Sequence, residues 1–113
     1  MAIVEKEARS VNATLQEMQT AIKEVLTSYT EGGYGEKSDL KNVLFFDDEH
    51  SRYLVRVQGT EKGQKVNDVV CHVEILKGEI ILIVENNSDQ EIKEKLVQKG
   101  INRNTIRTFE NLL

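Results

Sequence analysis

The stretch that decides the fold is residues 40–58, which read LKNVLFFDDEHSRYLVRVQ. Its first part, Leu40–Asp47, is predicted as a strand that is apolar on both faces, and Arg52–Gln58 alternates as a half-buried strand does. Residues 47–51 favour a turn, because Asp and Ser side chains bond their own backbone. The inward side chains are Tyr53, Val55 and Val57, and the outward ones are Arg52, Arg56 and Gln58. The stretch therefore predicts a β-hairpin.

Two more strands are predicted after this hairpin. Lys65–Leu76 alternates again, and Lys77 with Gly78 makes a tight turn into a strand over Glu79–Glu85. One face of the third strand carries Val69, Cys71, Val73 and Ile75, and the other carries Asp68, Val70, His72 and Glu74. Four strands joined by such short connections are expected to form an antiparallel meander.

A long helix is predicted before the sheet, from about residue 4 to Tyr29, ending at Gly32 and Gly33. Its apolar positions are Val4, Ala8, Val11, Leu15, Met18, Ile22, Val25 and Tyr29. These positions alternate steps of four and three, as a heptad stripe does. The stripe either packs on the domain's own sheet or pairs with another chain. A helix of ~26 residues rises ~39 Å, so its first turns are expected to overhang a small sheet.

A second helix is predicted over residues 89–99, after a capping box formed by Ser88 and Glu91 and before Gly100. A short last strand is expected at Thr105–Phe109. The predicted order is α-β-β-β-β-α-β, which is an α+β fold with its helices on one face of the sheet. The length of 113 residues fits one domain over residues 1–113.

Composition narrows the class of protein. The 15 Lys and Arg residues against 19 Asp and Glu give a net charge of −4, which is no nucleic-acid footprint. The single cysteine, Cys71, fits a reducing compartment, and the first residues lack the apolar run of a signal peptide. The longest apolar run, Ile80–Val84, is too short to span a bilayer. We expect a cytoplasmic protein.

Catalytic and metal-binding residues are not predicted, and no cofactor is implied. Cys71 and His72 are neighbours on a strand, so their side chains point to opposite faces and cannot form a nucleophile–base pair. The polar set that could bind a metal is Asp47, Asp48, His50, His72 and Glu74. Its spacing matches no established ligand signature.

A basic run near the C-terminal end offers a second hypothesis. The candidate DNA contacts are Lys95, Lys99, Arg103 and Arg107. Phosphates bind such cations. Cations late in a helix also complement its dipole, and no aromatic residues interleave with the run to stack bases.

Several stretches resemble one known family, the XisI family of fdxN-element excision controlling factors from cyanobacteria. The resemblance covers about residues 15–109. The stretches that carry it are Tyr34-Gly35, Leu44–Glu49 with Tyr53–Val57, Val70–Ile75 with Lys77–Ile80, Ile92 to Ile101, and Ile106 to Phe109. There are three departures, one of which is that the first helix is longer. The family usually has Trp after the glycine of its second strand, where Thr60 follows Gly59, and it usually has a His-Pro-Pro tail where residues 110–113 stand.

The resemblance implies a non-enzymatic accessory factor. Family members act with a companion, XisH, and a site-specific recombinase in DNA-element excision during heterocyst development. We therefore expect protein–protein contacts with an XisH-like partner, and possible self-association through the N-terminal helix. The candidate interaction residues are Leu15, Met18 and Ile22 on the helix and Arg56 and His72 on the sheet. Direct DNA binding is one alternative. A small enzyme or ligand-binding domain with a concave pocket is another.

Overall fold

The computed structural model describes residues 13–32, 34–35, 38–83 and 89–108 of the chain. The elements are the helix α2 (Leu15–Thr27), the 3₁₀ turn η1 (Ser28–Thr30), the strands β1 (Lys41–Asp47), β2 (Arg52–Glu61), β3 (Gln64–Leu76) and β4 (Glu79–Leu82), the helix α3 (Asp89–Gln98), the 3₁₀ turn η2 (Arg103–Thr105) and the strand β5 (Ile106–Thr108). The predicted α+β order is confirmed. Neither described helix combines the length and the apolar character needed to cross a membrane.

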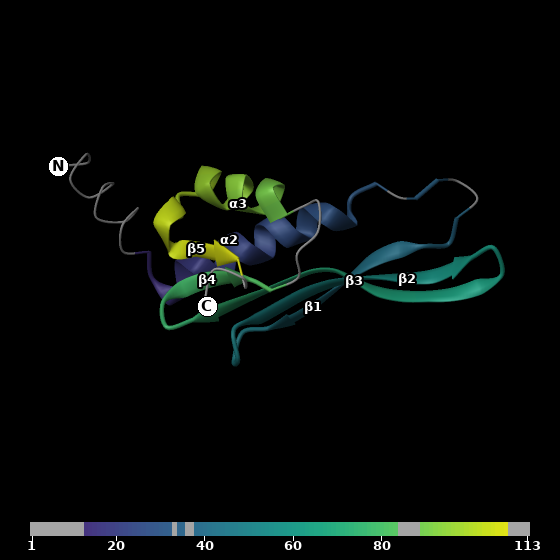
Figure 1. The fold of residues 1–113 in the computed structure, drawn as a ribbon, viewed down its shortest axis with the longest axis horizontal. Coiled ribbons are helices and arrows are strands. Elements are labelled where there is room, and N and C mark those ends of the chain that lie inside the picture. The colour runs from purple at the N-terminus through teal and green to yellow at the C-terminus, as the bar shows by residue number, and fades with distance from the viewer. Residues whose placement is uncertain (1–12, 33, 36–37, 84–88, 109–113) are drawn as a thin grey trace.

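The five strands form one sheet in the order β1-β2-β3-β4-β5. The first four pair antiparallel, which confirms the predicted meander. The β5 strand pairs with β4 in parallel, because α3 lies between them in the chain and returns it to the same end of the sheet. The β2–β3 hairpin closes through Lys62 and Gly63, both at positive φ, and Figure 1 shows it reaching beyond the two helices.

Both described helices lie on one side of the sheet, and the core fills the space between them (Figure 1). Tyr53 and Val55 of β2 and Leu26 of α2 are wholly buried there. The other buried members of this core are Met18, Ala21, Ile22, Val25, Cys71, Val73, Ile75, Ile80, Leu82, Ile92, Leu96, Ile101 and Ile106. The side of the sheet that faces the helices is called the covered face below, and the opposite side is called the open face.

The helix α2 begins later than the heptad stripe predicts. Thr14 is extended, with φ −71° and ψ 162°, and forms a capping box with Glu17. The Thr14 N–H donates to Glu17 Oε1 at 3.0 Å, and the Glu17 N–H donates to Thr14 Oγ1 at 3.1 Å. The prediction of one uninterrupted helix across Thr14 is therefore wrong, because α2 begins at this cap. The predicted stripe positions Val4, Ala8 and Val11 lie outside the described residues, as do Ser88 and Phe109.

A β-bulge in β3 reverses part of the predicted alternation. Val55 pairs with Cys71, but Arg56 pairs with Val69, so Val70 is the extra residue of the bulge. Val70 packs against the core. The predicted placement of Val70 on the polar face is wrong, and so is that of Val69 beside Cys71, because directly paired residues share a face and Val69 pairs with Arg56.

At Gly59, the covered face of the sheet is crossed by the chain segment before β1 and not by a helix. Its φ is +145°, and a Cβ built there would lie 2.7 Å from the carbonyl oxygen of Asp39. The Asp39 carboxylate accepts hydrogen bonds from the Thr60 N–H at 2.6 Å and from Thr60 Oγ1 at 2.7 Å. These bonds hold the pKa of Asp39 below its ordinary value. The segment before β1 is thereby fixed against the end of β2.

Candidate functional site

The open face carries an apolar row that crosses three strands. Phe45 of β1 pairs with Leu54 of β2, and Leu54 pairs with His72 of β3. Because alternate side chains point to opposite sides of a sheet, these three face away from the buried Tyr53 and Val55. Phe45 is 45% exposed, which is high for a phenylalanine in a sheet.

An open pocket of about 350 Å³ lies on this row. It is lined by Phe45, Phe46, Asp47, Arg52, Tyr53, Leu54 and His72. His72 was predicted as a candidate contact, whereas Phe45, Leu54 and Arg52 were not. A signal was present in residues 43–46, which are apolar on both faces and so place apolar side chains on the side away from the core. We call Phe45, Leu54 and His72 the open-face pocket.

The carboxylates on the open face have cationic or histidine partners. His72 Nε2 lies 2.8 Å from Glu74 Oε2, and Glu79 pairs with Arg107. Asp47 Oδ2, at the end of β1, lies 2.8 Å from His50 Nδ1, and this contact lowers the pKa of Asp47.

Two arginines flank Leu54 on β2 without an ion pair within the described part of the chain. Arg52 is exposed, and in the pairing of the strands it stands between Asp47 and Glu74 without an ion pair to either carboxylate. Arg56, another predicted contact, donates to neutral groups only, the side-chain oxygen of Asn67 at 2.9 Å and its carbonyl at 3.3 Å. The pocket therefore lies between two cations whose charge is available to a ligand.

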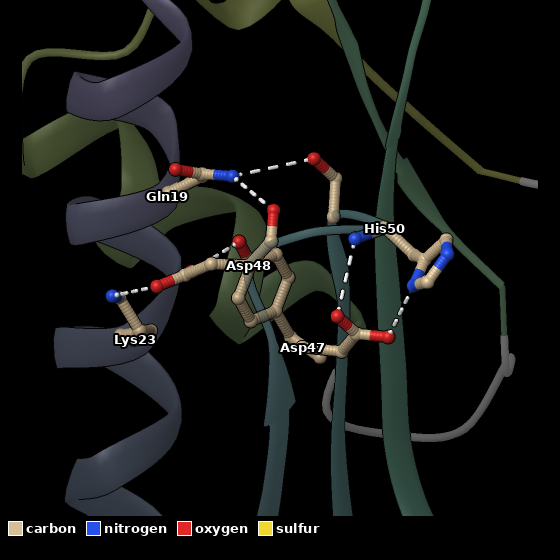
Figure 2. A network of polar contacts seen from close by, with 7 residues as sticks. Gln19, Lys23, Asp47, Asp48 and His50 are labelled. Carbon is tan, nitrogen blue, oxygen red and sulfur yellow. Dashed lines mark hydrogen bonds and ion pairs between the residues drawn. The ribbon is translucent and has the colours of Figure 1, made fainter.

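A polar network beside the pocket holds the β1–β2 turn to α2 (Figure 2). Asp48 accepts from Lys23 Nζ at 2.8 Å and from the Tyr53 hydroxyl at 2.7 Å. The Gln19 amide donates to the Asp48 carbonyl at 2.9 Å. Lys23 and then Tyr53 lower the pKa of Asp48, whereas burial and then Asp48 raise the pKa of Tyr53. This network is a structural attachment that fixes the strand end on which Arg52 and Leu54 are carried.

The candidate contacts on the helix separate into one exposed and two buried residues. Leu15 is 55% exposed, but Met18 and Ile22 are 4% and 1% exposed within the domain's own core. The prediction that all three form an outward contact stripe is therefore wrong for Met18 and Ile22, because the sheet covers the stripe from Met18 onward.

Each candidate DNA contact forms an ion pair with a carboxylate. The pairs are Lys95 with Glu91, Lys99 with Glu24, Arg103 with Glu94, and Arg107 with Glu79. Lys95 and Lys99 lie together beside α2, whereas Arg107 lies on the open face of the sheet. The Glu94 carboxylate raises the pKa of Arg103. The structure thus divides this basic run between surfaces and offsets its charge.

The polar residues considered for metal binding form separate pairs. Asp47 contacts His50 at the end of β1, and His72 contacts Glu74 on β3. Among the described residues, no three His, Cys, Asp or Glu side chains come close enough together to hold a metal ion. Cys71 is 1% exposed and belongs to the core, on the face opposite His72.

The fold and its open face define a two-layer α+β domain in which a four-stranded meander and a parallel fifth strand are covered by helices on one side. Solved structures share this architecture. The chain matches an XisI-like protein from Anabaena variabilis ATCC 29413 with a TM-score of 0.71 and 26% identity, over 83% of this chain and 84% of the other. It matches the fdxN element excision controlling factor XisI from the same organism with a TM-score of 0.67 and 19% identity, over 82% of this chain and 83% of the other.

The sequence itself gives the family. Residues 12–109 match the model of the family described as XisI protein, so the chain belongs to the XisI family. No curated protein gives a match. The family expected from the resemblance is confirmed.

Proposed function

We propose that this chain is a non-enzymatic accessory factor of the cytoplasm that acts by binding a protein partner through the open face of its sheet. In keeping with its family, the partner is an XisH-like protein, and the process served is DNA-element excision. The observation that carries the proposal is the open-face pocket, an apolar site on a sheet surface that no described helix covers.

The contacts of the site support binding more than catalysis. Phe45 and Leu54 supply apolar area, and aromatic and arginine side chains are the residue types that most often dominate protein interfaces. Each of the two histidines of the chain lies against a carboxylate. An exposed Phe in a strand has a cost in water that burial by a partner removes.

The proposal is tested by co-purification with an XisH-like protein, using two matched variants. Phe45→Ala removes an exposed apolar side chain from the open face, and Leu15→Ala removes one from the start of α2. We expect the unmodified chain and Leu15→Ala to retain the partner and Phe45→Ala to lose at least roughly tenfold in affinity, as interface anchors do.

Two results would contradict the proposal. Absence of any complex with the unmodified chain would remove the XisH-like partner. A complex lost in Leu15→Ala and kept in Phe45→Ala would move the interface from the sheet to the helix α2.

A further inference from the structure

We infer that the open-face pocket receives one bulky apolar side chain that is flanked by carboxylates in the partner's sequence. This inference rests on the proposed function and adds the chemistry of the segment that is recognised. It follows from three features of the open face, which are the size of the pocket, the pairing state of its charges and the order of side chains along β2.

The size of the pocket selects one side chain. Its volume of about 350 Å³ is at the low end of the range of roughly 300–1,000 Å³ that holds small ligands. Its side walls are Phe45, Leu54 and the ring of His72, which come from three neighbouring strands. An aromatic or branched aliphatic side chain fits such a surface, because burial of apolar area is what the walls offer.

The charges select the residues on either side of that side chain. The carboxylates of Asp47, Glu74 and Glu79 already have partners, whereas Arg52 and Arg56 have no ion pair among the described residues. Arg52 and Arg56 are therefore the cations beside the pocket with which a ligand's carboxylates can pair, although the whole chain carries −4. Arginine binds carboxylates with two parallel hydrogen bonds, which gives direction as well as attraction.

The order of side chains along β2 sets the spacing. Arg52, Leu54 and Arg56 follow one another at alternate positions on the open face, so an arginine stands on each side of the pocket wall. Alternate residues of a strand are about 6.6 Å apart, which matches the spacing of alternate residues in an extended partner segment. Such a segment would place its apolar residue at Leu54 and its acidic residues at the two arginines.

A nucleic acid is a poorer occupant of this surface. Phosphate binding depends on several cations along a groove. On the open face, Arg52 stands between the carboxylates of Asp47 and Glu74 across the strands, and Arg56 stands between Val43 and Val69. An apolar pocket between them also gains nothing from a phosphate backbone.

The inference is tested with labelled synthetic peptides and fluorescence anisotropy at low and moderate salt. One peptide carries a phenylalanine with one glutamate two positions before it and another two positions after it. A second peptide has lysines at those two positions, and a third has serine in place of the phenylalanine. We expect the first to bind the chain at least roughly tenfold more tightly than the other two, with affinity that falls as salt rises. When this peptide binds, the changes in the amide NMR shifts of the protein should centre on residues 45, 54 and 72.

Two charge variants of the chain provide a matched pair. The double variant Arg52→Gln with Arg56→Gln should lower the affinity for the glutamate peptide roughly tenfold. Its affinity for the glutamate and lysine peptides should then be equal. Arg103→Gln makes the same kind of charge change on the other surface, where Glu94 is its partner, and should leave binding unchanged.

Equal binding of the glutamate and lysine peptides, or no binding of any peptide, would overturn the inference. Displacement of the glutamate peptide by duplex DNA would also overturn it. The same holds if light scattering shows a dimer that Phe45→Ala converts to a monomer. These failures are distinct from failure of the proposed function. An XisH-like protein retained by the double arginine variant as well as by the unmodified chain would leave the proposed function standing and the inference wrong.

Discussion

The two faces of the sheet share the same strands but differ in what lies against them. On β2, Tyr53 and Val55 are 0% exposed beneath the helices, whereas Leu54 between them belongs to the open face. Because successive side chains point to opposite faces, one strand serves both the core and the exposed surface. Covered positions supply the apolar burial that stabilises the domain, and open positions are free to vary with a partner. The comparison predicts that neighbouring residues in the sequence respond to substitution in opposite ways.

The largest effect is expected at the centre of the covered face. Tyr53→Ala removes a wholly buried ring that packs edge-on against Phe46, and its hydrogen bond to Asp48. We expect the free energy of unfolding to fall by about 3–5 kcal/mol, the usual cost of deleting a buried aromatic side chain. Urea denaturation followed by circular dichroism measures it. A loss no larger than that of Phe45→Ala would break the comparison between the faces.

A smaller loss is expected where backbone shelters the covered face. Gly59→Ala would force a Cβ against the Asp39 carbonyl at a φ that side chains rarely adopt, and we expect about 2 kcal/mol of destabilisation. Gly63→Ala is the control, because its φ is also positive but nothing lies within 4 Å of its Cβ. Thermal melts of both variants compare them. Equal losses would show that backbone conformation alone matters and that the contact with Asp39 does not.

The attachment of α2 to the β1–β2 turn should appear in the pH dependence of stability. The pKa of Asp48 is lowered in the folded chain by Lys23 and Tyr53. Its stabilising contribution is therefore present above its unfolded pKa of about 3.9 and is lost as the pH falls through the lower folded value. Asp48→Asn should flatten the loss of stability below about pH 4. Melts over a pH series measure this, and Lys23→Gln should change the profile in the same direction. An unaltered profile in both variants would contradict the attachment.

The smallest effect on stability is expected on the open face. Phe45→Ala should change the free energy of unfolding by less than about 0.5 kcal/mol, as exposed substitutions usually do. The same variant is expected to weaken partner binding strongly. Denaturation and binding measured on one preparation sharpen the comparison most. A substantial loss of stability would show that Phe45 supports the fold, so that a loss of binding could no longer be assigned to the interface.

Local patterns were enough to predict most of the fold. Alternation at residues 52–58 and the turn at Lys77-Gly78 specify hairpins through neighbouring residues, so the meander was predictable. The start of α2 was also readable, because Thr14 and Glu17 spell a capping box inside the heptad stripe. The bulge at Val70 was not predictable, because it depends on which residues of β2 pair with Cys71 and Val69.

The candidate site was less predictable, because it depends on contacts between distant residues. Lys99 reaches Glu24 and Arg107 reaches Glu79, and no short-range pattern predicts those pairs. Because these ion pairs were not predicted, the basic run was interpreted as available to phosphates. His72 and Arg56 were named from the outward positions of their strands, and the structure places both on the open face. Phe45 was missed because an apolar strand is usually assumed to be buried on both sides.

The parallel pairing of β5 with β4 also has a consequence for how the chain assembles. The first four strands meet their neighbours across short turns, so those contacts close small loops. The β5 strand can join only after the chain has passed through α3, which makes its pairing the longest loop closure in the sheet. Loop-closure entropy delays such contacts. We therefore expect the meander to form first, and Ile106 to complete the core beside Ile80 late in folding.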